Sequence, residues 1–291
     1  MAQERKDDSI LIVGGDSSIG AALYDQYRRL GRSPWRTSRR AEREDKKLIH
    51  LDMLNPGSKP WGDLRPELVY ICAALTSQKA CEDDPELAEK VNVHCPCFLA
   101  RLAAEQAAFV VFLSSNVVFS GEEPLLAADA TKKPSSVYGD QKARVETYLE
   151  SEGFPSAIVR FGKVITREMQ LFRRWALQLR QGIKIEAFHD MYMAPVALPV
   201  AAEFLFRTGE SKESGIYQLT ANQDLSYYQA ATFMAERMGL DSSLIIAVSS
   251  ASLGLNPPKY TTLKCKGPEG ADSFTPNPQD ALDYFLEMTE E

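Results

Sequence analysis

Short apolar runs recur along the first half of the chain, and segments with a helical pattern separate them. Each run has the length of a single strand and is nearly apolar throughout. The expected strands cover residues 9–13, 68–72, 109–113 and 157–161. Continuous apolar strands that alternate with helices are typical of a parallel sheet with helices on both faces. The pattern therefore predicts an α/β fold with a doubly wound parallel sheet of the Rossmann type.

The segments between these runs place apolar residues at helical spacing. One helix is expected to end near Gly31, where a C-terminal cap fits, and its inward residues are Ile19, Leu23, Tyr27 and Leu30. A second helix begins at Glu86, and Pro96 is expected to kink it. Its apolar face comprises Leu87, Val91, Cys95, Phe98, Leu99 and Leu102.

The alternation loosens beyond about Val164. A helix is expected over Arg167–Arg180, and its inward residues are Met169, Phe172, Ala176 and Leu179. We expect residues 1–165 to form an NAD(P)-binding domain. Residues 166–291 then form a smaller, mainly substrate-binding portion, from which about 195–220 return to the first domain.

Composition limits the classes of partner. The chain has 291 residues and a net charge of −7, which argues against nucleic acid as a partner because phosphate binding needs clustered Lys and Arg. No apolar run is long enough to cross a membrane, and no secretory signal follows Met1. The five cysteines lack C-x-x-C spacing, which indicates a reducing compartment, the cytoplasm. The three histidines lie far apart and predict no metal site, and Cys95 and Cys97 favour core packing.

A glycine-rich loop, Gly14–Gly20, joins the first strand to the first helix. Such a loop places helix amides where a dinucleotide pyrophosphate binds. Gly14 allows the tight turn, and Gly20 allows the helix to approach the strand. Ser18 and Ile19 open the helix. Ser17 occupies the middle glycine position of a G-x-x-G-x-x-G pattern, where its side chain should crowd the pyrophosphate unless its hydroxyl donates to it. The alternative is a plain connection.

The end of the second strand bears on the choice of cofactor. The segment Thr37–Arg40 has no acid to accept from a ribose 2′-hydroxyl, whereas Arg39 and Arg40 suit a 2′-phosphate. This favours NADP, with NAD possible. The alternative is a solvated basic turn. Asp52, after the third strand, is expected to accept from the adenine amino group, or else to cap a turn.

Tyr138 and Lys142 stand four residues apart, on one face of a helix. A neighbouring ammonium favours the phenolate and lowers the pKa of a tyrosine, as proton exchange with a carbonyl or alcohol requires. Ser114 and Ser115 follow the strand 109–113, at the ligand edge of the predicted sheet. By itself the Tyr–Lys pair also fits a surface helix.

Taken in order, these segments resemble the extended short-chain dehydrogenases, and among them the dTDP-4-dehydrorhamnose reductase-like group. The resemblance runs from about Ile10 to about Gly239. Residues 73–76, 82–85 and 91–92 resemble the group's A-A-Y-T, E-x-x-P and V-N. Residues 114–121 resemble its S-T-D-Y-V-F-D-G, and 136–142 match S-V-Y-G-x-x-K. Residues 192–195 and 215–219 stand where Y-G-S-P and G-x-Y-H-L are usual.

The resemblance implies roles for individual residues. Tyr138 would be the general acid, and Lys142 would bind the nicotinamide ribose and lower the tyrosine pKa. Ser115 would hydrogen-bond the reacting oxygen. The resemblance further implies cofactor contacts along the chain at Gly14, Ser17, Gly20, Ala73, Ala74, Thr76 and Asn92.

Departures from the group lie mainly in the substrate pocket. Asn116 replaces Asp, Val117 replaces Tyr, and 161–165 read F-G-K-V-I where the group has T-S-W-V-Y. We therefore expect an NADPH-dependent reductase of a keto group on a nucleotide-activated sugar, with the sugar left open. Candidates for contact with the sugar-nucleotide diphosphate, or for a solvated helix face, are Arg173, Arg174, Arg180 and Lys184.

Two alternatives remain open. One is an epimerase or dehydratase that regenerates a tightly held NAD in each cycle. The other is a non-catalytic binding or regulatory protein on the same fold, because a fold does not determine function. A homodimer is the commonest assembly for such a chain.

Overall fold

A computed structural model describes residues 9–40, 45–268 and 274–287 of the chain. Its centre is a seven-stranded sheet in the order β11-β6-β5-β4-β1-β2-β3, and every neighbouring pair is parallel. The strands are β1 (Ile10–Val13), β2 (Trp35–Ser38), β3 (Leu48–His50), β4 (Leu68–Ile71), β5 (Phe109–Ser115), β6 (Ser156–Phe161) and β11 (Gly215–Leu219). The predicted doubly wound α/β fold is confirmed.

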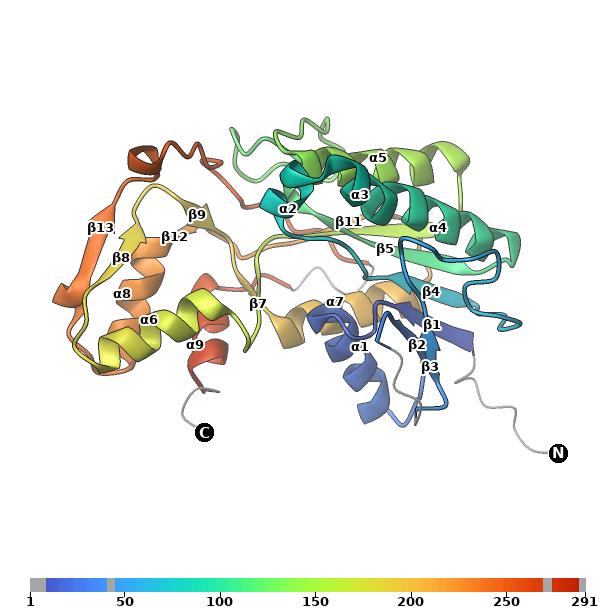
Figure 1. Ribbon diagram of the computed structural model, residues 1–291, viewed down its shortest axis with the longest axis horizontal. Helices are drawn as coiled ribbons and strands as arrows, with labels where there is room; N and C mark the ends of the chain where they lie inside the picture. The colour runs from blue at the N-terminus through green and yellow to red at the C-terminus, as the bar shows by residue number, and fades with distance from the viewer. Residues whose placement is uncertain (1–8, 41–44, 269–273, 288–291) are drawn as a thin grey trace.

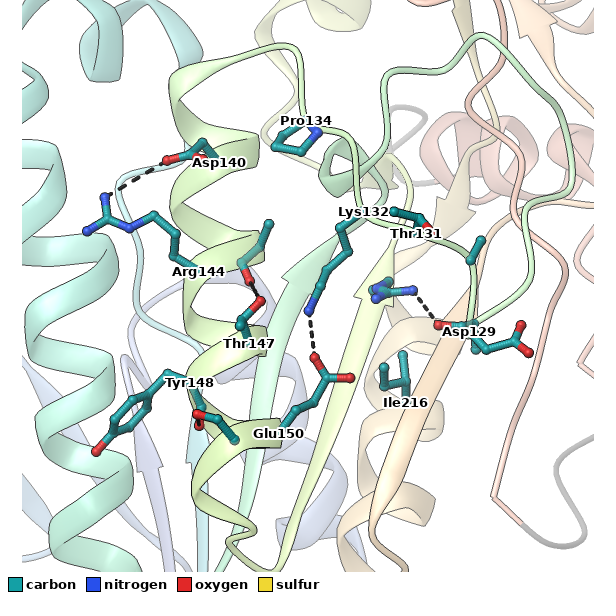
Figure 2. Close-up of a pocket in the computed structure, with 15 residues that line it drawn as sticks. Asp129, Thr131, Lys132, Pro134, Asp140, Arg144, Thr147, Tyr148, Glu150 and Ile216 are labelled. Atoms are coloured by element: carbon teal, nitrogen blue, oxygen red, sulfur yellow. Dashed lines mark hydrogen bonds and ion pairs between the residues drawn. The ribbon is translucent and has the colours of Figure 1, made fainter.

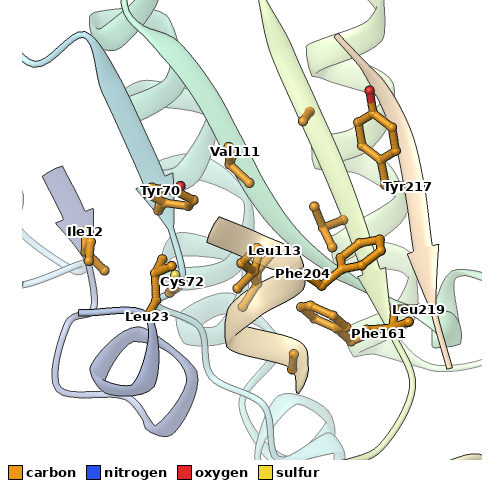
Figure 3. Packing of buried hydrophobic residues seen from close by; sticks show 14 of the residues in the cluster. Ile12, Leu23, Tyr70, Cys72, Val111, Leu113, Phe161, Phe204, Tyr217 and Leu219 are labelled. Atoms are coloured by element: carbon orange, nitrogen blue, oxygen red, sulfur yellow. The ribbon is translucent and has the colours of Figure 1, made fainter. Parts of the chain in front are cut away.

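Helices cover both faces of this sheet (Figure 1). On one face lie α2 (Gln78–Asp83), α3 (Pro85–Glu89), α4 (Cys95–Glu105) and α5 (Val137–Glu152), and on the other lie α1 (Ser18–Arg29) and α7 (Leu198–Ser211). Figure 3 shows how side chains of β1, β4, β5, β6 and β11 pack against α1 and α7. Because strands such as β1 and β4 are buried along their whole length, their apolar residues could be recognised as continuous runs.

The helix expected from Glu86 differs from the prediction. It is interrupted at Lys90–His94 by a π-helical turn, after which α4 begins at Cys95. Pro96 is the second residue of α4, and the residues before it are helical, so its missing N–H and its ring disturb the preceding turn, where Asn92 stands four residues earlier. The irregular turn therefore lies directly before Pro96, where the helix was expected to kink.

The remaining elements lie mainly to one side of the sheet. They are α6 (Gln170–Arg180), β8 (Ile185–Phe188), α8 (Tyr227–Arg237), β13 (Ile245–Val248) and α9 (Pro278–Glu287), with 3₁₀ turns at Ser242–Leu244 and Ser250–Leu253. Two short strand pairs form separate sheets in the chain after β6: β7 (Val164–Ile165) with β10 (Val196–Ala197), and β9 (Tyr192–Met193) with β12 (Leu225–Ser226). They share a separate apolar cluster centred on Phe172, Trp175 and Phe285.

The division of the chain at about residue 165 stays a prediction, as does the assignment of the two parts to cofactor and substrate. Strand β11, within the range 195–220, is the edge strand of the large sheet and pairs with β6. Across the described ranges, no helix is long and apolar enough to cross a membrane.

Candidate active site

A cavity of about 710 Å³ lies at the carboxyl ends of the central strands. Ser115, Tyr138 and Lys142 all line it, although they come from β5 and from two turns of α5. The other part of the chain contributes the opposite wall, which is mostly apolar and aromatic: Val164, Thr166, Met191, Tyr192, Met193, Tyr227, Pro257 and Pro258. The structure therefore places the three expected catalytic residues in one cavity.

A second cavity, of about 430 Å³, continues from the first. Ser17 and Ala74 line both, so the two spaces meet at the glycine-rich loop. Most of the expected cofactor residues divide between them. Ser18, Ile19 and Thr76 line the first cavity, whereas the second is lined by Gly14, Arg39, Arg40, Asp52 and Ala73. The result is one groove along the carboxyl edge of the sheet.

The glycine-rich loop has the backbone that close packing demands. Gly14 has φ +78°, and a Cβ there would meet Ala73 at 2.7 Å. A Cβ on Gly20 would lie 2.2 Å from the carbonyl oxygen of Gly14. Among the residues that the structure describes, no acceptor is recorded for the amides of Ser18 and Ile19 in the first turn of α1. Two free amides at a helix N-terminus fit a pyrophosphate.

Ser17 does not direct its hydroxyl proton toward the groove. Its Oγ donates to the carbonyl of Gly14 at 2.7 Å and accepts from the amide of Gly20 at 3.1 Å. Ser17 is therefore the N-cap of α1. The sequence left open whether this side chain crowds the pyrophosphate or donates to it, whereas its single proton is in fact used within the loop.

The far end of the groove carries charges of both signs. Arg39 and Arg40 are exposed and line the second cavity, and no ion pair of either side chain is recorded within the described ranges. Asp16, which sequence analysis missed, lines the same cavity and accepts a 2.7 Å hydrogen bond from Ser38 Oγ. The loop thus brings a carboxylate to the strand end that lacks an acid of its own.

Two expected cofactor residues are engaged within the protein. Asp52 accepts from the amide of Leu54, so it caps a turn while it also lines the second cavity. Asn92 is fully buried in the π-helical turn. Its side chain bonds both backbone groups of Leu75 and the side chain of Gln141. Asn92 thus holds the loop after β4, which includes Ala74 and Thr76, and lines neither cavity.

The electrostatics of the Tyr–Lys pair differ from the expectation. Burial raises the pKa of the Tyr138 phenol well above its usual value, and Cys81 adds to the rise. Lys142 does not offset this, because its Nζ lies 5.7 Å from the centre of the tyrosine ring and donates to the Leu113 carbonyl at 2.8 Å. Burial in turn lowers the pKa of Lys142 to about 8. The expected lowering of the tyrosine pKa is thus wrong for this geometry.

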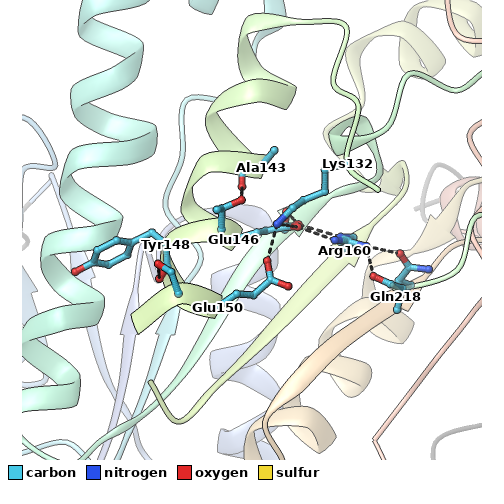
Figure 4. A network of polar contacts seen from close by, with 11 residues as sticks. Lys132, Ala143, Glu146, Tyr148, Glu150, Arg160 and Gln218 are labelled. Carbon is cyan, nitrogen blue, oxygen red and sulfur yellow. Dashed lines mark hydrogen bonds and ion pairs between the residues drawn. The ribbon is translucent and has the colours of Figure 1, made fainter. Parts of the chain in front are cut away.

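A buried polar network joins α5 to β6 and β11 (Figure 4). Glu146 follows Lys142 by one helical turn and accepts from Ser114 Oγ at 2.5 Å. Both Glu146 oxygens accept from Arg160 of β6, at 3.0 and 2.7 Å. Arg160 also donates to Gln218 of β11, and Glu146 and Arg160 are both within 1% of full burial. The network ties α5 to three strands beside Ser115.

Another cavity, of about 790 Å³, lies elsewhere (Figure 2). It is lined by other residues of α5 and by the loop before it, and Lys132 and Glu150 form an ion pair in it. None of the expected catalytic or cofactor residues lines it. Size alone therefore does not identify the site.

The basic residues that were candidates for contact with a diphosphate do not line the cavity that contains Ser115, Tyr138 and Lys142. Helix α6 buries Phe172 and Leu179 and exposes its arginines, which is the solvated helix face of the alternative interpretation. Lys163, by contrast, lines the cavity, although sequence analysis assigned it no role. The available signal was the departure at 161–165, where a lysine stands in place of an aromatic residue. Within the described ranges no cluster of side chains suits a metal ion.

Comparison with known proteins gives a family match over nearly the whole chain. A family model described as the RmlD substrate binding domain matches residues 8–289. The beta subunit of methionine adenosyltransferase 2 from Xenopus laevis is 24% identical over 263 residues, which is 85% of this chain and 77% of that protein. A dTDP-4-dehydrorhamnose reductase from Shigella flexneri is 27% identical over 192 residues, 62% of this chain and 64% of that protein.

A solved structure supports the fold. The dTDP-4-dehydrorhamnose reductase from Bacillus anthracis, in complex with NADP, has a TM-score of 0.82 to this chain at 18% identity. The match covers 96% of this chain and 98% of that one. At this level of identity the likeness establishes the shared fold.

Proposed function

Because the chain belongs to the family described as the RmlD substrate binding domain, we propose that it is an NADPH-dependent reductase of a keto group on a nucleotide-activated sugar. One observation carries the proposal. Ser115, Tyr138 and Lys142 line a single cavity, and that cavity continues into the groove beside the glycine-rich loop. A hydroxyl, a phenol and an ammonium at the end of a dinucleotide groove are the groups that carbonyl reduction needs.

The residues of the groove fit a dinucleotide phosphate. Gly14 and Gly20 leave space that a Cβ would fill, the amides of Ser18 and Ile19 are free for a pyrophosphate, and Arg39 and Arg40 suit a 2′-phosphate. When bound, the cofactor supplies the hydride. Asn92 acts through the loop after β4 and is a positioning residue. Asp16 opposes the arginines, which keeps NAD as a possible cofactor.

Tyr138 serves as the proton donor in this proposal. The Tyr138 phenol carries its proton at neutral pH and lines the cavity, so it can give that proton to the oxygen of a carbonyl as charge develops there, although burial makes it a weaker acid than free tyrosine. Ser115 Oγ lines the same cavity, and its hydroxyl, which donates to Asn116 Oδ1 over a long 3.3 Å, donates to that oxygen after turning away from Asn116.

The test is turnover by the protein alone. Purified chain, NADPH and dTDP-4-dehydrorhamnose, with other 4-keto nucleotide sugars in parallel, should consume NADPH in proportion to the alcohol formed. NADPH and several nucleotide sugars that bind without any turnover would contradict the proposal.

A second candidate is a subunit of another enzyme. The specific observation is that relatives matching 85–88% of this chain are named as the beta subunit of methionine adenosyltransferase 2, whereas the reductase relatives match about three fifths. In this case ligands would raise the melting temperature without chemistry. Co-purification with a methionine adenosyltransferase, together with no turnover, would support it.

We further propose a cytoplasmic location and a homodimer. All five cysteines have free thiols, and burial raises the pKa of Cys72 and Cys95 to about 12, which suits packing in a reducing compartment. Dimers are the commonest assembly of soluble chains. Sedimentation of the purified protein at several concentrations tests the dimer.

A further inference from the structure

The cavity lined by Ser115, Tyr138 and Lys142, called the main cavity below, carries positive side chains although the whole chain has a negative net charge. The protein carries a net charge of −7, yet no Asp or Glu stands among the described residues that line this cavity. Two lysines do, Lys142 and Lys163. A cavity with positive groups and no carboxylate attracts anions whatever the net charge of the molecule.

The two lysines differ in what they contact. Lys142 Nζ donates to the Leu113 carbonyl and lies 4.6 Å from the centre of the Phe112 ring. Within the described ranges no acceptor or ion-pair partner is recorded for the Lys163 side chain. The surrounding protein lowers the pKa of Lys163, although the side chain still reaches solvent. An ammonium held against protein without a counter-charge gains most from an anionic ligand.

Lys163 lies at the reacting end of the cavity. It follows β6 by two residues, and Phe161 of β6 is the register partner of Ser115. Its backbone is fixed, because its carbonyl accepts from the Val196 amide at 2.8 Å beside the short β7–β10 pair. The backbone of Lys163 is therefore fixed two residues past the register partner of Ser115, and its side chain lines the same cavity.

We propose that Lys163 binds an anionic oxygen group of the substrate, a carboxylate or phosphate oxygen, and so selects acidic substrates. The proposal rests on the proposed function. Two sources share this chemistry: a carboxylate on the sugar ring and the diphosphate of the nucleotide. The backbone of Lys163, two residues past the register partner of Ser115, favours the sugar carboxylate.

The experiment measures binding to protein saturated with NADP⁺, so that the cofactor groove is filled. The probes are UDP, UDP-glucose and UDP-glucuronate, with dTDP and dTDP-glucose alongside. The variants are Lys163→Met, Lys163→Arg and, as the matched control, Lys184→Met, an exposed lysine outside the cavity. Isothermal titration gives each dissociation constant at two salt concentrations.

If the anionic group is a sugar carboxylate, Lys163→Met should weaken the binding of UDP-glucuronate by about tenfold or more and leave the binding of UDP and UDP-glucose unchanged. Lys163→Arg should then restore most of the lost affinity. The diphosphate as the source predicts that Lys163→Met weakens every nucleotide by a similar factor. Lys184→Met should change none. Equal affinities of wild type and Lys163→Met for all five probes would overturn the proposal.

Failure of the proposed function gives a different result. If the wild-type protein binds no nucleotide, that function is contradicted, and inorganic pyrophosphate then tests Lys163 directly. Weaker pyrophosphate binding by Lys163→Met than by wild type or Lys184→Met would support the anion site. Identical binding by all three would overturn it.

Discussion

At the scale of single residues, the site combines a phenol that holds its proton with an ammonium that is costly to keep charged. Burial moves the Tyr138 pKa up and the Lys142 pKa down, in both cases toward the neutral form. Among the described residues, Lys142 donates to a single acceptor, the Leu113 carbonyl. The pair therefore costs folding stability, as groups that are kept for chemistry commonly do.

Lys142→Met should make this cost visible through pH. With a folded-state pKa of about 8, below its unfolded value, Lys142 binds fewer protons in the folded protein between these two values. Wild-type stability should therefore rise through this window. The free energy of unfolding of wild type minus that of Lys142→Met should therefore increase by about 3 kcal/mol between pH 7 and pH 10.5. Urea unfolding at each pH gives the difference, and a pH-independent difference would refute the assignment.

Asp16 and the two arginines should act on cofactor choice with opposite signs. Asp16→Asn removes a negative charge near the expected 2′-phosphate, so the dissociation constant for NADPH should fall by about threefold to fivefold. The same change should leave NADH unchanged or weaker. The Arg39→Ala, Arg40→Ala double variant should weaken NADPH selectively. Asp25→Asn, an exposed acid of α1 outside the second cavity, is the control. Equal NADPH-to-NADH ratios in all of these proteins would remove the three residues from the account.

At the scale of elements, α5 organises the site. Tyr138, Lys142 and Glu146 follow one another at four-residue spacing, so a single helix face carries the phenol, the ammonium and the buried carboxylate. Glu146 anchors this face to Ser114 of β5 and to Arg160 of β6. Because Ser114 is next to Ser115, this network aligns the helix with the strand that carries the third expected catalytic group.

Glu146→Gln should be strongly destabilising. It leaves the Arg160 guanidinium buried without its counter-charge, which costs about 3 kcal/mol of unfolding free energy or more. Glu150→Gln is the matched control: Glu150 is one turn further along α5, is 45% exposed in its side chain, and pairs with Lys132 at 2.6 Å. We expect that control to cost less than about 1 kcal/mol. Similar losses in both variants, measured by denaturant unfolding, would contradict the role of the network.

Element predictions from sequence succeeded where burial alone decides. β1, β4, β5 and β6 are apolar runs because helices cover both faces of the sheet, and the expected helix over Arg167–Arg180 corresponds to α6 from Gln170. The π-helical turn at Lys90–His94 could not be predicted, because its apolar spacing resembles that of an α-helix. Asn92 makes its tertiary hydrogen bonds to Leu75 and Gln141 from this turn, and Pro96 follows four residues later.

At the scale of the whole molecule, two parts of the chain meet over one groove. The sheet supplies the glycine-rich loop, Ser115, Tyr138 and Lys142, and the elements after β6 supply the opposite wall. Local motifs predicted the first set. Asp16 and Lys163 were not predicted, because their neighbours in the structure are distant in the sequence. Asp16 bonds Ser38, and Lys163 shares the main cavity with residues from many parts of the chain. The arginines of α6 were candidates for an anion site but lie on an exposed helix face outside the cavity. Sequence alone does not separate these two cases, because both have the same local pattern of basic residues.

The central claim is that Tyr138 protonates the oxygen of a reacting carbonyl in this groove. The most direct measurement compares wild type with Tyr138→Phe in NADPH oxidation by one 4-keto nucleotide sugar, alongside the NADPH dissociation constant of each protein. Loss of the donor with retention of the ring predicts a fall in kcat of about a hundredfold or more, with NADPH binding close to normal. A Tyr138→Phe protein that turns over at the wild-type rate would contradict the account.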